Sequence, residues 1–298
     1  MDIRSLTQFL EVARNQSYTK AAQKMFLAQP TLTKTIKGLE SELDVKLFDH
    51  QGQRIVLTDY GNQLVRLAEP LVNEFNRLPE LIHDIGNNPV GPVNVSTTPM
   101  LAGLYLVNFL PEFNNQYPAI DLQLRESNTF SIIEDVRRNK VDVGFCMDTE
   151  ELQKSSDLEL RKLFSKQIIA LIHNQNPLSQ KESISIEDLK DEKINTYVFG
   201  HAMNRELYHR CQNAGFLPQI NFSSNVTLFL IRLTEAGSGI TIMPKAYLRS
   251  NPSHGTIAVP FEPIFPWECY MILKKGRYLS EASRVFVDYA MNYFKNLG

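Results

Sequence analysis

The strongest constraint on the fold is an amphipathic helix predicted near the N-terminus, over residues 30–43. Its apolar side chains recur at steps of three and four residues, which predicts one narrow buried stripe. Pro30 suits the first turn, where its missing N–H costs no hydrogen bond. The members of the stripe are Leu32, Ile36, Leu39 and Leu43.

Short elements are predicted on both sides of this helix. A first helix is expected over the opening residues and a second over residues 19–25, introduced by Ser17. An apolar stretch after the amphipathic helix is predicted to be a strand. A turn that contains Gly52 is predicted next, and residues 54–58 are predicted to form the second strand of a hairpin. Three short helices followed by a hairpin indicate a winged helix-turn-helix, which we place at residues 1–58.

Positive charge is concentrated in this region, although the whole chain is nearly neutral. The 31 Lys and Arg against 33 Asp and Glu give a net charge of -2. This excludes a uniformly basic coat for nucleic acid but allows a local basic patch. Residues 1–58 hold eight cations and six acids, a net charge of +2, which leaves -4 for the remainder.

The polar residues of the helix-turn-helix are the predicted DNA-binding set. A helix in the major groove contacts bases mainly through its N-terminal residues. Gln can bind adenine, Thr can contact a thymine methyl, and Lys can reach guanine or phosphate, while an Arg beside the hairpin turn fits a phosphate contact. An ordinary solvated helix face would also carry Lys and Thr. The predicted residues are Ser17, Gln29, Pro30, Thr31, Thr33, Lys34, Lys37 and Arg54.

Residues 59–88 are predicted to form a linker and dimerisation helix. Their apolar residues repeat at steps of three and four, close to a coiled-coil seam. Pro70 and Pro79 fall inside this pattern, so we expect a kink near one of them. A cluster of Gly, Asn and Pro follows and marks a domain boundary. The members of the seam are Leu64, Leu67, Leu71, Phe75, Leu78, Ile82 and Ile85.

Residues 92–298 alternate predicted strands and helices, which indicates a mostly parallel sheet covered by helices. This length is large for a single sheet, so two subdomains with a cleft are expected. The fold class is therefore α+β and multidomain.

The sequence also resembles a known family. The first 61 residues are similar to the N-terminal domain of LysR-type transcriptional regulators, and the C-terminal region resembles the family's effector domain. Two positions depart from the pattern: His50 stands where the family usually has Arg, and Gln16 where it usually has Gly. The matching residues are Phe9, 17–22, 29–33, Ile36, Leu39-Glu40, Leu47-Phe48, Leu57-Thr58, Gly61, Leu110-Pro111, 141–144, 236–240 and Pro244.

The resemblance implies a two-lobed, periplasmic-binding-protein-like domain with an effector between its lobes. Lobe 1 would comprise about 92–161 and 267–298, and lobe 2 about 162–266. Ligands bind at the carboxyl ends of strands in such folds, and helix N-termini there favour an anion such as a carboxylate. Simple N-capping is the competing explanation for each Ser or Thr. The predicted effector residues are Thr97, Thr98, Asn128, Thr129, His201 and Thr227.

The predicted function is that of a ligand-responsive, DNA-binding transcriptional regulator of the bacterial cytoplasm. The expected partners are double-stranded DNA, a small-molecule co-inducer and further copies of the chain, which would form a dimer or tetramer. RNA polymerase is a further candidate partner. No cofactor, metal site or membrane span is predicted. The alternatives are a helix-turn-helix protein fused to an enzyme and a solute-binding protein. Against an enzyme, the sequence lacks a Gly-rich phosphate loop, GxSxG and HExxH.

Three cysteines, Cys146, Cys211 and Cys269, are too few and too irregular for a disulfide framework. Peroxide-sensing members of the family use a cysteine pair in the second lobe. Only Cys211 is near that position, so thiol redox sensing is not expected. Cys146 is expected to be buried and inert.

Overall fold

The computed structural model describes residues 1–51, 54–83, 89–198 and 200–295 of the chain. The chain forms two compact units. The first contains residues 1–88 together with the short segment 137–141, and the second contains residues 89–136 and 142–298. Within the described ranges, no helix combines the length and apolarity that crossing a bilayer requires.

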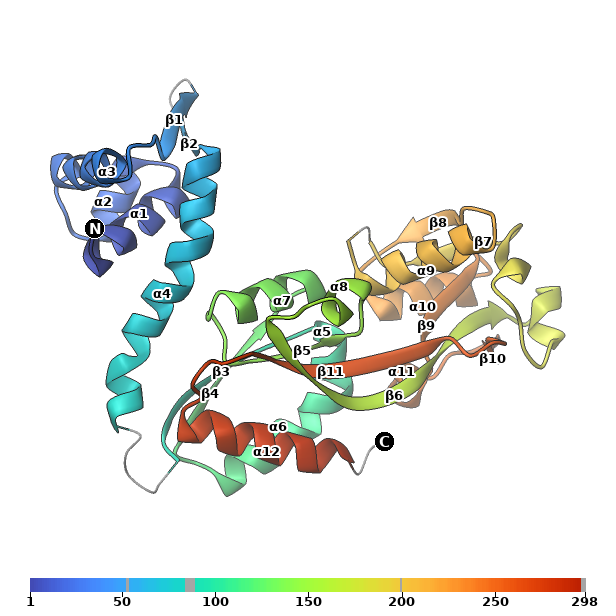
Figure 1. Ribbon diagram of the computed structural model, residues 1–298. Helices are drawn as coiled ribbons and strands as arrows, with labels where there is room; N and C mark the ends of the chain where they lie inside the picture. Colours follow the sequence, from blue (N-terminus) through green and yellow to red (C-terminus); the bar gives the residue numbers. More distant parts are fainter. Residues whose placement is uncertain (52–53, 84–88, 199, 296–298) are drawn as a thin grey trace. The chain divides into compact units, whose positions relative to one another are not determined.

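The first unit is a winged helix-turn-helix followed by a long helix (Figure 1). Its core includes Phe9, Leu32 and Ile36, which are fully buried. The hairpin strands are antiparallel, with Phe48 opposite Leu57. The elements in order are α1 (Ile3–Asn15), α2 (Tyr18–Lys24), α3 (Gln29–Leu43), β1 (Phe48–Gln51), β2 (Arg54–Leu57) and α4 (Asp59–His83).

In two details the structure differs from the predicted stripe and hairpin. Leu43 is 36% exposed, so the stripe ends at Leu39. The reason is local: α3 stops at Leu43, and Asp44 turns the backbone into the left-handed region with φ 53°. The first hairpin strand begins only at Phe48, three residues later than the apolar run at Val45 suggests.

The helix α4 is continuous over 25 residues and includes both Pro70 and Pro79. Neither proline breaks it, and a bend at either position stays a prediction. The expected seam divides into two faces. Leu64 packs on the core of the winged domain beside the buried Ala68 and Val72. The other face is exposed and carries Leu67, Leu71, Phe75, Leu78 and Ile82.

The second unit is built on one nine-stranded sheet with the order β4-β3-β5-β11-β6-β9-β7-β8, in which β10 also pairs with β6. The strands are β3 (Gly91–Thr97), β4 (Ile120–Glu126), β5 (Val143–Met147), β6 (Leu158–His173), β7 (Lys193–Thr196), β8 (Gln219–Ser223), β9 (Ile240–Pro244), β10 (Thr256–Pro260) and β11 (Pro266–Lys274).

The two ends of this sheet form two lobes. In lobe 1, β3 is parallel to both β4 and β5, and in lobe 2, β7 is parallel to both β8 and β9. The long strands β6 and β11 run antiparallel to each other between these two parts (Figure 1). The chain therefore passes between the lobes along two paired strands, as the two-lobed prediction requires.

Helices cover both lobes. In lobe 1, α6 (Val107–Gln116) and α12 (Glu281–Lys295) pack together through aromatic rings, with Phe109 and Phe286 centroids 5.5 Å apart. Trp267 is fully buried on β11, opposite Lys166 of β6. The other helical elements include α5 (Pro99–Leu101), the π-helical segment η1 (Ala102–Leu106), α7 (Thr129–Arg137), α8 (Glu150–Gln153), α9 (Ala202–Asn213), α10 (Thr227–Glu235) and α11 (Tyr247–Ser250).

Candidate functional site

The helix α3 presents a polar face opposite its buried stripe. Ala28 precedes the helix and provides no side-chain cap, and Pro30 lies in the first turn. The Gln29 amide donates to Thr33 Oγ1 at 3.0 Å, which orients both polar groups on the same face. Thr33 is partly buried, whereas the remaining predicted residues of this helix are exposed: Gln29, Pro30, Thr31, Lys34 and Lys37.

The two lysines of this face are available for an external anion. Lys34 and Lys37 have no ion-pair partner within the described part of the chain, whereas Lys24 of α2 pairs with Glu11 at 2.7 Å. Ser17 caps α2, because its Oγ accepts from Lys20 N at 3.3 Å. Arg54 stands at the start of β2, and its side chain, like that of His50, lies outside the described residues.

One exposed residue near this face was not predicted from the sequence. Phe26, in the turn between α2 and α3, is 96% exposed and has φ 55°. A left-handed backbone costs a residue with a Cβ about 1–2 kcal/mol, and a full phenyl ring in water adds no compensating contact. In the sequence Phe26 is only a bulky apolar residue between two predicted helices.

The second unit contains a cavity of about 710 Å³, within the usual size of a small-molecule site. It lies among the N-terminal ends of α5, α7, α9 and α10, so both lobes contribute. Thr97 does not line it, because this residue is buried at the end of β3. The predicted effector residues that do line it are Thr98, Asn128, Thr129, His201 and Thr227.

Several of these side chains already act as helix caps. Thr98 Oγ1 accepts from Leu101 N at 3.4 Å. Asn128 Oδ1 accepts from Ser131 N at 3.0 Å, and His201 Nδ1 accepts from Met203 N at 3.2 Å. The helix α10 differs, because no side chain caps its first turn. Its N-terminal N–H groups are therefore the most available to a ligand.

His201 is a neutral donor in this cavity. Burial lowers its pKa from 6.5 to about 4, so the ring carries no charge at neutral pH. Because Nδ1 accepts a hydrogen bond, the single proton of the neutral ring is on Nε2. The ring stacks on Tyr197 with centroids 4.3 Å apart.

Tyr197 was not predicted as a site residue. It is 1% exposed, its hydroxyl lies 3.3 Å from Thr227 Oγ1, and burial raises its pKa above the usual value. The sequence offered only its position directly after a strand end. None of the described residues that line the cavity is an Asp, Glu, Lys or Arg. Its chemistry therefore consists of neutral hydroxyls, amides, one imidazole and backbone N–H groups.

A contact between the lobes lies beside this cavity. The Arg205 guanidinium carbon of α9 lies 4.4 Å from the centroid of the Phe130 ring of α7. Cation–π contacts of this kind stabilise by about 0.5–1 kcal/mol at exposed sites. The contact therefore links α7 of lobe 1 to α9 of lobe 2.

All three thiols lie in the interior of the second unit. Cys146, Cys211 and Cys269 are all fully buried and none is in a disulfide. Burial raises the pKa of Cys211 to about 11 and raises those of Cys146 and Cys269 as well. Because the thiolate is the reactive form, such cysteines react slowly with oxidants.

Comparisons with known proteins agree with both units. Residues 3–62 match the family described as bacterial regulatory helix-turn-helix protein, lysR family, and residues 86–295 match the LysR substrate binding domain. The chain is 30% identical over 295 residues to an uncharacterized HTH-type transcriptional regulator, YwbI, of Bacillus subtilis, covering 98% of this chain and 97% of that protein.

More distant similarity extends to regulators with other names. The DNA-binding transcriptional dual regulator OxyR of Escherichia coli is 26% identical over 244 residues, 82% of this chain and 79% of that protein. Full-length OxyR from Pseudomonas aeruginosa superposes with a TM-score of 0.70 at 20% identity, covering 99% of this chain and 95% of that one. The latter similarity concerns the fold alone.

The winged domain, the long helix and the two-lobed domain together define a DNA-binding transcriptional regulator with an effector-binding domain. The protein belongs to the LysR family of bacterial regulators. It is a regulator and not an enzyme, which sets aside both a fused enzyme and a solute-binding protein.

Proposed function

We propose that this regulator binds a small organic anion in the 710 Å³ cavity and thereby changes how its winged domains engage DNA. The observation that carries the proposal is the convergence of neutral donors from both lobes on one cavity without an acidic side chain. Oriented N–H and hydroxyl donors suit a carboxylate. A ligand held by both lobes shifts the protein toward the state that it binds more tightly.

On the DNA side, the exposed face of α3 is the proposed base-reading surface, with Lys34 and Lys37 contacting bases or phosphates. The protein would act as an oligomer. The exposed apolar face of α4, Leu67 to Ile82, is the proposed dimer contact, since exposed apolar stripes of this kind mark helix–helix interfaces. We further propose that the complex acts on RNA polymerase at promoters in the bacterial cytoplasm.

The buried cysteines favour a bound co-inducer over thiol oxidation as the signal. Each thiol is fully buried and has a raised pKa. The chain is similar in sequence to a hydrogen peroxide-inducible genes activator, but in our proposal it does not respond to peroxide.

The test is a thermal-shift screen of the full chain against carboxylates, amino acids and sugars. A ligand that binds only the folded protein raises the melting temperature. We expect a dose-dependent shift with a carboxylate that Thr129→Val abolishes, because this side chain is 3% exposed and lines the cavity. Thr256→Val, on β10, is the control and should retain the shift. A shift with sugars alone would contradict an anionic effector.

A further inference from the structure

The segment that links α7 to β5 belongs to the first unit, although the residues on both sides of it belong to the second. Residues 137–141 group with residues 1–88, whereas residues 89–136 and 142–298 form the second unit. Arg137 is the last residue of α7, so this helix ends inside the first unit. We call residues 137–141 the strap.

The strap is held on α4 by an ion cluster around one buried carboxylate. Glu69 of α4 is 3% exposed. Its oxygens pair with Arg138 and Lys140 of the strap, each at 2.9 Å, and with Arg14 of α1 at 3.0 Å. Burying a carboxylate is costly unless it is paired. The two strap cations therefore help to satisfy a charge that α4 buries.

Asparagine hydrogen bonds fix the strap along the same helix. Asn73 Nδ2 donates to the Arg138 carbonyl at 2.7 Å. Asn139 Nδ2 donates to Glu74 Oε2 at 3.2 Å and to the Pro70 carbonyl at 3.5 Å. Positions three and four residues apart lie on one face of a helix, so these contacts cover one face of α4. The docking therefore depends on register as well as on charge.

Asn139 gives the strap its turn. Its φ of 55° lies in the left-handed region, which Asn adopts more readily than most residues and which Gly adopts without steric cost. The residue is only 9% exposed. Its amide is thus fixed against α4 and differs from the solvated side chain of an ordinary surface loop.

The other end of α7 lies at the effector cavity, which Thr129 lines. The body of the helix is anchored by Ile132, Ile133 and Val136, which are fully buried. The helix has nine residues and is therefore about 14 Å long. A packed helix of this length moves as one body, so a displacement at Thr129 reaches the strap.

We propose that the strap couples the effector cavity to α4, the helix that packs on the core of the winged domain. A change at the N-terminal end of α7 alters how the strap docks on Glu69 and Asn73, and a change in α4 acts on the cavity by the same route. Glu69, Asn73 and Asn139 are positioning residues, since none of them lines the cavity. The proposal rests on DNA binding by the winged domain and is independent of the identity of the co-inducer.

The test combines hydrogen exchange with a variant in which the strap is loosened. Asn73→Ala removes the donor to the Arg138 carbonyl, and Asn139→Gly removes the amide while Gly accepts the left-handed backbone. The double variant leaves the ion cluster and every cavity residue unchanged. The matched control combines Asn115→Ala with Asn213→Gly, at exposed asparagines of α6 and α9.

The full-length protein is first measured without DNA. Amide exchange of the strap, corrected for intrinsic rates, should be about threefold faster or more in the double variant than in the wild type, because two contacts that oppose local opening are absent. The control should match the wild type. Equal exchange of the strap in the double variant and the wild type would overturn the proposal.

The second step adds a duplex from the region upstream of the protein's own gene. Protection of residues 29–37 of α3 reports that the DNA is bound. In the wild type and the control, exchange of residues 129–136 of α7 should then change by about threefold or more, because coupling between two sites is reciprocal. In the double variant, the protection of α3 should remain and the change in α7 should be lost.

Two results of this step would also overturn the proposal. The first is unchanged exchange of α7 in the wild type while α3 is protected. The second is a full change of α7 in the double variant, which would mean that DNA binding reaches the cavity by another route. Absence of α3 protection in the wild type would instead contradict the proposed base-reading face, and the exchange of the strap without DNA would then decide on the docking.

Discussion

Replacing His201 by Asn should remove a pH-dependent part of the stability of the second unit. Asn keeps an oxygen that can accept from Met203 N, so the cap of α9 is retained. It removes the titratable ring and its stacking on Tyr197. The variant should therefore be less stable at pH 8 by about 1 kcal/mol, from the lost ring contact.

The magnitude of the pH effect comes from the pKa of His201, which is about 4 in the folded protein against 6.5 for a free side chain. Above 6.5 both states are neutral and the full stability is present. As the pH falls below 6.5, His201 becomes protonated in the unfolded chain, whereas in the folded chain it stays neutral until the pH approaches 4. Each pH unit then costs about 1.4 kcal/mol, so about 2 kcal/mol is lost by pH 5.

The assay is urea unfolding at several pH values between 8 and 5, followed by Trp267 emission, which reports on the same unit. The stability advantage of the wild type over His201→Asn should shrink and then reverse as the pH falls. His209→Asn, at an exposed histidine of the same helix, is the control and should follow the wild type. If the free energies of unfolding of the wild type and of His201→Asn changed in parallel with pH, the reasoning would be refuted.

Three further predictions concern the first unit. Gln16→Gly should raise its stability by about 1 kcal/mol in chemical denaturation, because Gln16 has φ 48° at the end of α1; a loss of stability would contradict this. Phe26→Gly should leave stability unchanged or slightly higher but weaken DNA binding at least threefold in anisotropy titrations, and an unchanged DNA affinity would remove Phe26 from the DNA surface. Glu69→Gln should cost about 1–3 kcal/mol, because the buried carboxylate pairs with the partly exposed Arg14 and Lys140 at 3.0 and 2.9 Å, and equal urea midpoints would contradict it.

The Glu69 contribution should also depend on pH. Burial acts to raise its pKa, but hydrogen bonds from Lys140, Arg14 and Arg138 outweigh burial and lower it below the usual value. Its stabilisation is therefore present above the unfolded pKa and is lost as the pH falls through the lower folded pKa. Glu69→Gln should show a flatter acid limb than the wild type.

Local patterns in the sequence were sufficient for the buried stripe of α3 and for a helix cap, whereas a cavity between two lobes was expected from the family resemblance. The spacing of Leu32, Ile36 and Leu39 on α3 predicts their burial. The place of Thr98 at a strand–helix junction predicts a helix cap, as found, and in the structure Asn128 and His201 cap helices as well. These features depend on short-range backbone hydrogen bonding, which neighbouring residues largely determine.

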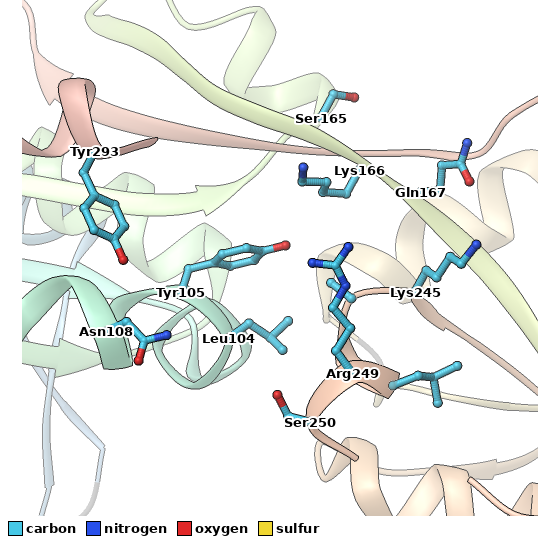
Figure 2. A pocket seen from close by; sticks show the side chains of 12 residues that line it. Leu104, Tyr105, Asn108, Ser165, Lys166, Gln167, Lys245, Arg249, Ser250 and Tyr293 are labelled. Carbon is cyan, nitrogen blue, oxygen red and sulfur yellow. The ribbon is translucent and has the colours of Figure 1, made fainter. Parts of the chain in front are cut away.

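Features that depend on long-range packing were not accessible. Tyr105 and Arg249, which lie far apart in the sequence, line one cavity of about 680 Å³ (Figure 2). The division of the α4 seam into a packed and an exposed face depends on where the winged domain's core ends, which spacing does not encode. Leu64 and Leu67 therefore both fit the apolar repeat of the seam, but Leu64 packs on the core of the winged domain and Leu67 is exposed.

The central claim is that α3 reads DNA, and the most direct test is the salt dependence of binding. Full-length wild type, Lys34→Ala and the control Lys154→Ala, an exposed lysine of the second unit, are titrated by fluorescence anisotropy. The probe is a duplex from the region upstream of the protein's own gene, at several salt concentrations. The account predicts that Lys34→Ala weakens binding and reduces the slope of log affinity against log salt by about 1, while the control matches the wild type. An affinity and a slope for Lys34→Ala equal to those of the control would contradict it.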